Sequence, residues 1–178
     1  MTKNTPEVFP LYTDQLKHTP LGDLWLATSQ VGLVAVSWSK KELSFQEYLF
    51  KRFKRPSEIN AGRLALTFDE LYEYLQGRLK TFSIPIDWSL LRPFQQAVLK
   101  ATFAIPYGET RCYGEIAAEI ERPGAARAVG RAEATNPMPL VIPCHRVIGV
   151  DGKLRGYGGG QGLPTKEWLL KLEGVLIT

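Results

Sequence analysis

The chain has 178 residues, of which 44% are hydrophobic and 22% charged, ordinary values for a globular protein of one large or two small domains. No stretch is long and apolar enough to span a bilayer, and residues 1–17 do not resemble a signal peptide. We therefore expect a cytoplasmic protein without a membrane partner. Residues 1–88 hold 11 basic and 10 acidic side chains, whereas residues 89–178 hold 11 and 8, so a polyanionic partner fits the second half better.

The chain has few of the side chains that bind zinc, cysteine and histidine. The chain has two cysteines, Cys112 and Cys144, and two histidines, His18 and His145, with no C-x-x-C or H-x-x-x-H spacing among them. A structural zinc site requires four such ligands in a closed set. The sequence therefore predicts no metal site and two free thiols, with Cys112 in a packing role and His18 on the surface.

The first half reads as strands followed by helices. Residues 24–28 and 33–38 are short apolar runs joined by a turn with Gly32, which predicts a β-hairpin. Two amphipathic helices follow, because apolar residues recur there at helical spacing. The two stripes are Phe45, Tyr48, Leu49 and Phe53, then Phe68, Leu71, Tyr72, Leu75 and Leu79. Residues 83–88 look extended, because Pro85 resists helix, and we place the domain junction just after them.

The second half reads as helical. One helix starts at Pro93, and residues 115–120 and 125–134 form two more around a Pro-Gly break, which predicts a helix-turn-helix. The last helix is almost bare, with mainly Ala and Gly besides Arg127 and Arg131. Composition leaves two interpretations open: a tightly packed core helix with solvated arginines, or a slim rod that approaches a DNA groove.

The chemistry concentrates around Cys144. An apolar run, residues 140–142, leads through Pro143 to a thiol that precedes His145 and Arg146. A lone buried cysteine is normally inert, but these neighbours favour a thiolate, and His145 is a candidate base. In an extended segment adjacent side chains point to opposite faces, so a thiol–imidazole contact needs a turn or a bridging water. The residues alone predict a reactive thiol.

Residues 143–149, Pro-Cys-His-Arg-Val-Ile-Gly, resemble the signature of the O6-alkylguanine-DNA alkyltransferases (methylated-DNA–protein-cysteine methyltransferases). Further matches follow in the order of that family and cover nearly all of residues 92–174. They are Pro93-Phe94-Gln95, residues 105–110, 113–117 and 127–130, Asn136-Pro137, and residues 156–160 and 166–174. The first 90 residues resemble the family only loosely, as a small α/β domain.

The resemblance implies an α/β (α+β) fold. Residues 1–90 would form a small ribonuclease-H-like α/β roll, and residues 91–178 a helical, winged-helix-like domain for DNA binding and catalysis. The implied function is DNA repair by one irreversible transfer of the alkyl group of O6-alkylguanine to Cys144, with O4-alkylthymine left open as a substrate. The protein would act as a monomer on double-stranded DNA, with no cofactor.

The resemblance also implies roles for single residues. His145 would activate Cys144 through a water, Glu173 would orient His145, Asn136 would hold the turn, and Tyr113 would aim its hydroxyl at N3 of the guanine. The nucleotide would flip out through the minor groove, as base-modifying proteins require. Arg127 would fill the vacated stack, with Ala126, Gly130, Arg131 and Tyr113 also at the DNA. The substrate pocket would comprise Val147, Tyr157, Gly158 and Pro139.

The sequence differs from the family pattern at two places, and two alternative functions compete with the implied one. Gly158 stands where some relatives carry Ser, and residues 161–165 form a longer spacer than in some of them, which bears on the pocket rim. Alkyltransferase-like proteins that only bind the lesion lack the cysteine, so Cys144 disfavours that function. A thiol hydrolase using Cys144 and His145 is disfavoured because no oxyanion-hole motif is present and the helix-turn-helix would be idle.

Overall fold

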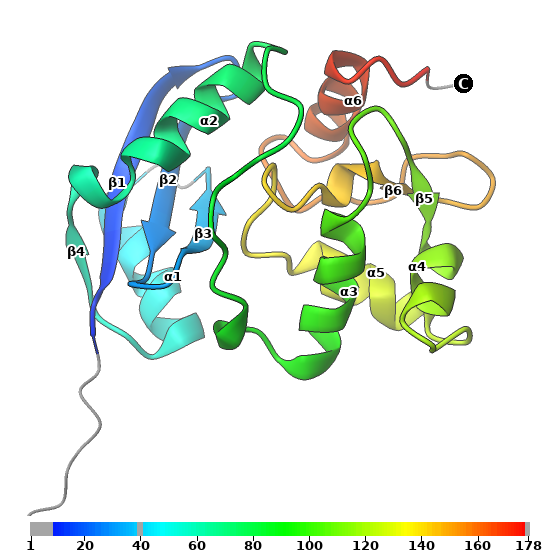
Figure 1. Cartoon of the computed structure of the whole chain (residues 1–178), viewed down its shortest axis with the longest axis horizontal. Coiled ribbons are helices and arrows are strands. Elements are labelled where there is room, and N and C mark those ends of the chain that lie inside the picture. The colour runs from blue at the N-terminus through cyan, green and yellow to red at the C-terminus, as the bar shows by residue number, and fades with distance from the viewer. Residues whose placement is uncertain (1–8, 39–40, 177–178) are drawn as a thin grey trace, which may run out of the picture.

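The computed structural model describes residues 9–38 and 41–176, in which a part built on a mixed sheet precedes a helical part (Figure 1). Part of the segment that we judged unlike a signal peptide, residues 1–8, lies outside the described residues. The elements of the first part are β1 (Leu11–Thr19), β2 (Gly22–Thr28), β3 (Leu33–Ser37), α1 (Glu42–Phe53), β4 (Ser57–Ile59), the 3-10 turn η1 (Ala61–Arg63), α2 (Ala65–Leu75) and the 3-10 turn η2 (Trp88–Leu90).

The sheet has the order β3-β2-β1-β4, antiparallel except for the parallel pair β1–β4. The predicted hairpin is therefore confirmed as β2–β3. Successive side chains of a strand point to opposite faces, and both faces of this sheet are covered. Trp25 packs on Phe45 of α1 with ring centroids 6.0 Å apart, whereas Leu24 and Leu26 belong to the cluster that contains Leu71 of α2.

Both predicted helices of this part are present, but the second differs in its end and in its buried face. It stops at Leu75 because Gly77 adopts a φ of +73°, so the predicted stripe wrongly extends to Leu79. Tyr72 was also assigned to the buried stripe wrongly, because it is 45% exposed while Tyr74 is fully buried. Strand β1 was not predicted at all.

The segment between the two parts is extended, as predicted, and it lies along the edge of the sheet. Leu33 donates from its N–H to the Pro85 carbonyl at 2.8 Å and accepts from the Asp87 N–H at 3.0 Å. A Cβ at Gly32 would lie 2.4 Å from the Pro85 oxygen, so only glycine permits this approach. The buried Asp87 side chain accepts from Ser29 Oγ at 2.6 Å and fixes the junction.

The second part consists of α3 (Pro93–Phe103), β5 (Arg111–Cys112), α4 (Tyr113–Glu119), α5 (Ala126–Ala134), the 3-10 turn η3 (Cys144–Arg146), β6 (Val147–Ile148) and α6 (Leu163–Leu172). The predicted helix pair is confirmed as α4 and α5. Helix α4 starts earlier than predicted because the Glu115 carboxylate accepts the Cys112 N–H at 2.6 Å in a capping box. Val98, Val129 and Val147 share one core cluster, which fixes α5 against α3 and the strand after η3.

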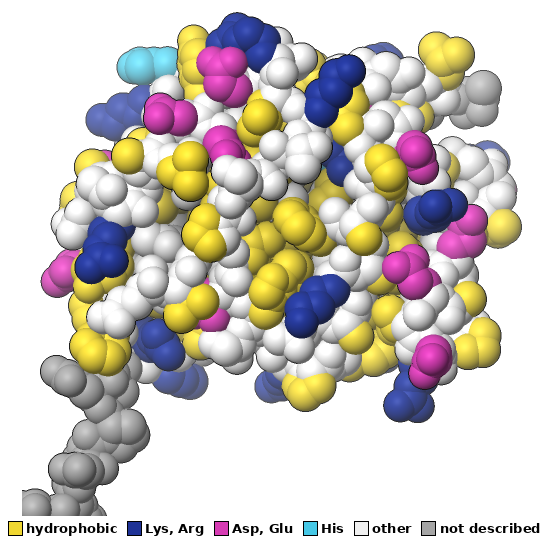
Figure 2. All heavy atoms as spheres, in the orientation of Figure 1, with side chains coloured by type: hydrophobic (Ala, Val, Ile, Leu, Met, Phe, Trp, Pro, Cys, Tyr) yellow, Lys and Arg dark blue, Asp and Glu magenta, His cyan; other side chains and the backbone are white. Residues whose placement is uncertain are grey.

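The two parts share a hydrophobic core. Leu26 of the sheet belongs to the same buried cluster as Leu99 and Leu169, and Val36 donates from its N–H to the Pro137 carbonyl at 2.8 Å. On the face shown in Figure 2, hydrophobic side chains gather along the middle, where the parts meet. In residues 9–38 and 41–176 no helix is both long and apolar enough to cross a membrane.

Candidate active site

Cys144 begins the 3-10 turn η3, so the structure has a turn at the cysteine, one of the two alternatives that the sequence left open. Pro143 precedes it, and the turn is closed by a hydrogen bond from the Arg146 N–H to the Pro143 carbonyl at 2.8 Å. Burial raises the pKa of the Cys144 thiol to about 12, and the charge of Glu133 acts in the same direction. Asn136 and Lys166 act against this shift. The thiol is therefore protonated at neutral pH and needs a base to react.

His145 is fully buried in a hydrogen-bonded group with Glu173 and Tyr74. Its Nε2 lies 2.9 Å from Glu173 Oε1, which also accepts from the Tyr74 hydroxyl at 2.6 Å. Burial lowers the pKa of His145, although Glu173 favours the charged form, so the imidazole is neutral at pH 7. A carboxylate only accepts, so Nε2 carries the hydrogen and Nδ1 carries the lone pair. Nδ1 is buried and has no partner among the described residues.

Arg146 is bonded to Glu173 and does not assist the thiol as the sequence suggested. Its Nε and one terminal nitrogen donate to Glu173 Oε2 and Oε1, each at 2.8 Å, and its other terminal nitrogen donates to the Ile105 carbonyl at 2.6 Å. The Gly108 N–H adds a bond to Oε2 at 3.2 Å. Burial alone would raise the pKa of Glu173, but the bonds from His145 and Arg146 lower it to about 2. Glu173 is thus a fixed carboxylate.

Asn136 holds the turn before the cysteine. Its side-chain nitrogen donates to the Ile142 carbonyl at 3.0 Å, and its side-chain oxygen accepts the Met138 N–H at 2.9 Å. Leu140, between them, adopts a φ of +77°, a conformation that a leucine rarely takes without such support. Asn136 therefore fixes the path of the chain two residues before Cys144.

A pocket of about 580 Å³ opens beside α5. It is lined by Tyr113, Ala126, Arg127, Gly130, Ala134, Arg155, Gly156, Tyr157 and Gly158. Six of the predicted DNA-binding and pocket residues therefore meet in one cavity. Gly130 permits this, because a Cβ there would lie 3.8 Å from the Tyr113 ring and a longer side chain would fill the space. Burial raises the pKa of Tyr113 to about 12, so its hydroxyl keeps its proton.

Three of the predicted DNA-binding and pocket residues lie outside the lining of this pocket, and the predicted nucleophile Cys144 is not among its lining residues either. Arg131 is exposed one turn after Arg127 on α5. Val147 is fully buried in the core, and Pro139 is buried and lines a neighbouring cavity on the side of α1. A pocket contact of Val147 with a base would thus have to come from its backbone.

Sequence reasoning missed four residues around the site. Tyr74 reaches it from α2 in the other part of the chain, and no local pattern announces that. Arg155 lines the pocket from the loop after β6. Lys166 and Glu133 are ionisable residues at 0% and 6% exposure. Glu133 had a detectable signal, because it is the single acidic residue among the small residues of α5.

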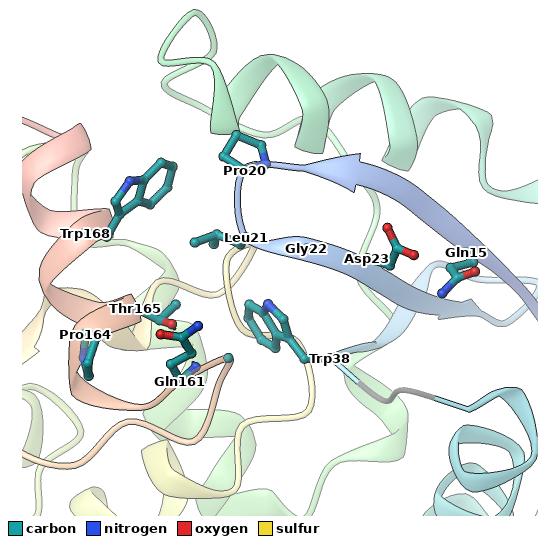
Figure 3. A pocket seen from close by; sticks show the side chains of 11 residues that line it. Gln15, Pro20, Leu21, Gly22, Asp23, Trp38, Gln161, Pro164, Thr165 and Trp168 are labelled. Carbon is teal, nitrogen blue, oxygen red and sulfur yellow. Dashed lines mark hydrogen bonds between the residues drawn. The ribbon is translucent and has the colours of Figure 1, made fainter.

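A larger cavity of about 780 Å³ lies away from this chemistry. Figure 3 shows it between the β1–β2 turn and α6, with Trp38 and Trp168 on either side of Leu21. Its titratable residue is Asp23, whose carboxylate accepts the His18 N–H at 2.9 Å. Gln161, from the longer spacer, also lines it. The part of the chain described has no group of three His, Cys, Asp or Glu side chains that could hold a metal ion.

Comparison with known proteins gives one family for both parts. Residues 11–88 match the family described as the ribonuclease-like domain of 6-O-methylguanine DNA methyltransferase, and residues 93–175 match its DNA binding domain. The chain is 42% identical over 165 residues to the methylated-DNA–protein-cysteine methyltransferase of Salmonella typhimurium, covering 89% of this chain and 94% of that one.

Solved structures agree with this family. The chain is similar to the Mycobacterium tuberculosis OGT in complex with DNA, with a TM-score of 0.74, 41% identity, and coverage of 91% of this chain and 92% of that one. It shares its fold with the O6-methylguanine-DNA methyltransferase of Pyrococcus kodakaraensis, with a TM-score of 0.69 at 23% identity, covering 93% of this chain and 99% of that one. The expected fold class, a ribonuclease-like α/β part followed by a helical DNA-binding part, is confirmed.

Proposed function

The chain belongs to the methylated-DNA–protein-cysteine methyltransferase family, the DNA-repair proteins that remove the methyl group from O6-methylguanine, and from this premise we propose that Cys144 is the acceptor. The observation that carries this assignment is the placement of His145 beside Cys144, with Nε2 bonded to Glu173 and the buried Nδ1 without a partner among the described residues. Glu173 fixes its Nε2 at 2.9 Å and leaves Nδ1 as a base one residue from the buried thiol. We infer that a water relays the Cys144 proton to Nδ1.

The transfer is a displacement at saturated carbon. The Cys144 sulfur forms a bond to the methyl carbon while the bond from that carbon to O6 breaks and its electron pair stays with the guanine. The proton of the thiol goes to His145. Tyr113, protonated and beside Gly130 in the pocket, donates a hydrogen bond to N3 and so stabilises the negative charge that develops on the base. The departing guanine anion takes up one proton from water and His145 returns the thiol proton to water, so the products are guanine and S-methylcysteine.

The partner we propose is double-stranded DNA entered from the minor groove. Methylated guanine inside a duplex cannot reach the pocket, so the nucleotide must flip out. Arg127 is exposed at the pocket rim, on a helix whose Ala126 and Gly130 allow close approach of a groove. Arg127 would fill the vacated stack, Arg131 would contact phosphate, and Tyr157, Gly158 and the backbone of Val147 would hold the base.

We further propose that the protein works once, as a monomer in the cytoplasm, without a cofactor. The product S-methylcysteine is a thioether, and no residue of this site can break its carbon–sulfur bond. The methyl group therefore remains on the protein. We assign the DNA chemistry to residues 91–178 and the supporting α/β domain to residues 1–90. A methyl-transfer assay on duplex DNA that contains O4-alkylthymine tests whether that base is also a substrate.

Mass spectrometry after mixing the protein with duplex DNA containing O6-methylguanine tests the proposal. We expect one added methyl on the peptide that carries Cys144, and no uptake by Cys144→Ala, which should still bind the duplex. Cys112→Ala is the matched control and should react like the wild type, because Cys112 pairs with Glu115 at the start of α4 and does not belong to the hydrogen-bonded group of His145 and Glu173. Binding without an adduct would identify a lesion binder, and turnover would identify a hydrolase.

A further inference from the structure

Glu133 is a buried carboxyl that the proposed transfer leaves without a role. It lies on the buried side of α5 with Val129 and Ala132. Its Oε1 accepts a hydrogen bond from Thr102 Oγ1 at 2.5 Å, and its Oε2 is buried with no partner among the described residues. Burial of a carboxyl with so little hydrogen bonding favours the protonated form, and the pKa of Glu133 is raised to about 7.

The backbone places Glu133 close to the nucleophile. Helix α3, which carries Thr102, packs on both α5 and η3. The Asn136 N–H donates to the Glu133 carbonyl at 3.1 Å, and the Asn136 side chain holds the carbonyl two residues before Cys144. The charge of Glu133 accordingly acts on Cys144 and also on Tyr113 of α4, raising the pKa of each.

A buried cation, Lys166, interacts electrostatically with both Glu133 and Cys144. Lys166 of α6 is fully buried, and its Nζ donates to the Val147 carbonyl at 2.6 Å. An ammonium in such surroundings needs an anion nearby. Burial lowers the pKa of Lys166, and the two acidic groups that oppose this are Cys144 and Glu133. The Lys166 ammonium therefore interacts with two acidic groups, the Cys144 thiol and the Glu133 carboxyl.

We propose that Glu133 and Cys144 compete for one negative charge beside Lys166, so that protonation of Glu133 releases Lys166 to stabilise the Cys144 thiolate. This inference rests on Cys144 being the methyl acceptor. When Glu133 is ionised, a thiolate would be a second anion in the same buried space, and like charges there disfavour each other. Glu133 does not touch the reacting atoms in this scheme. It is a positioning residue that sets where the charge lies.

Glu133→Gln tests the competition, because the amide keeps the acceptor for Thr102 but cannot ionise. The measurement is the rate of Cys144 alkylation by iodoacetamide between about pH 5.5 and about pH 9, with peptide mapping to separate Cys112. We expect equal rates at the acidic end, where Glu133 is protonated. Above about pH 8 the variant should react about tenfold faster, which corresponds to one unit of thiol pKa. Glu47→Gln, an exposed carboxyl on α1, is the charge-matched control and should follow the wild type at every pH.

Thr102→Val provides a second, independent variant. Loss of the hydroxyl that supports the carboxylate should shift the inflection of the Cys144 profile to higher pH. A Glu133→Gln rate that differs from the wild type by the same factor at all pH values, or an unmoved inflection in Thr102→Val, would overturn the proposal. If Glu133→Gln does not fold, Thr102→Val decides. Because iodoacetamide needs no DNA, failure of methyl transfer would refute the proposed function and leave this result standing.

Discussion

At the scale of single residues, one set of contacts orients the His145 ring, and another keeps it uncharged. Glu173 and Tyr74 hold the ring on one side, at 2.9 and 3.2 Å from Nε2. Arg146 neutralises Glu173, so that the carboxylate does not force a proton onto the imidazole. The neutral ring keeps Nδ1 available. The arrangement gives a base where a charged imidazole would give none.

His145→Gln should slow methyl transfer at neutral pH by about a hundredfold to ten-thousandfold, the usual contribution of a positioned base. The loss should shrink toward high pH, where the thiol ionises unaided. Rates measured against pH on methylated duplex check this, with His18→Gln as control because His18 is exposed at the far end of β1. A deficit of constant size across the pH range would show that His145 only supports the fold.

At the scale of elements, α5 determines how DNA approaches the pocket. Arg127→Ala should lower the rate on duplex DNA much more than the rate on free O6-benzylguanine, which requires no flipping. Binding of duplex should also weaken as salt rises, since phosphate contacts release counterions. Arg63→Ala, an exposed arginine on η1, is the control. If the two rates fell equally, Arg127 would not fill the space that the flipped nucleotide leaves in the base stack.

Two substitutions of Gly130 test the stability of helix α5 and the shape of the pocket independently. Gly130→Ala should raise the free energy of unfolding by about 0.5–1 kcal/mol, because alanine is the better helix former and its Cβ meets only ordinary contacts at 3.8 Å. Gly130→Leu should instead block methyl transfer by occupying the space beside Tyr113. Chemical denaturation and transfer rates distinguish the two effects. An inactive alanine variant, or a fully active leucine variant, would contradict this geometry.

Local sequence signals predicted most of the helices and one hairpin, and missed elements that lack such a signal. Helices α1, α3, α4 and α5 and the β2–β3 hairpin follow from local pattern. Strand β1 was missed because its second half is polar and half-exposed. Local propensity does not indicate the turn at Cys144; the family resemblance assigned Asn136 to it, and the Asn136 side chain bonds to the Ile142 carbonyl. Tyr74 could not be found as a site residue, since its partners lie 71 and 99 positions away.

At the scale of the whole molecule, the site belongs to both parts of the chain. Tyr74 comes from α2, His145 from η3 and Glu173 from the end of α6, and all three are buried at the shared core. The pH dependence of unfolding should therefore report the same groups that the chemistry uses. Two buried glutamates make opposite contributions there.

The pKa of Glu173 is about 2 in the folded chain against 4.5 when unperturbed, so its stabilisation is present above pH 4.5 and is lost as pH falls toward 2. The pKa of Glu133 is about 7, so its ionisation destabilises the fold progressively from pH 4.5 to 7 and fully above. Glu173→Gln should lower the free energy of unfolding at pH 7 and Glu133→Gln should raise it at pH 8, each by roughly 3 kcal/mol at most. Denaturant unfolding at several pH values measures both, and shifts of the same sign would contradict these assignments.

The central claim is one methyl group per molecule, carried on Cys144. The direct measurement is a titration of a known amount of protein with excess duplex containing O6-methylguanine, followed by peptide mapping. We expect transfer to stop at one methyl per chain, all of it on the peptide with Cys144 and none on Cys112. Removal of more than one methyl per chain, or a methyl on any other residue, would contradict the account.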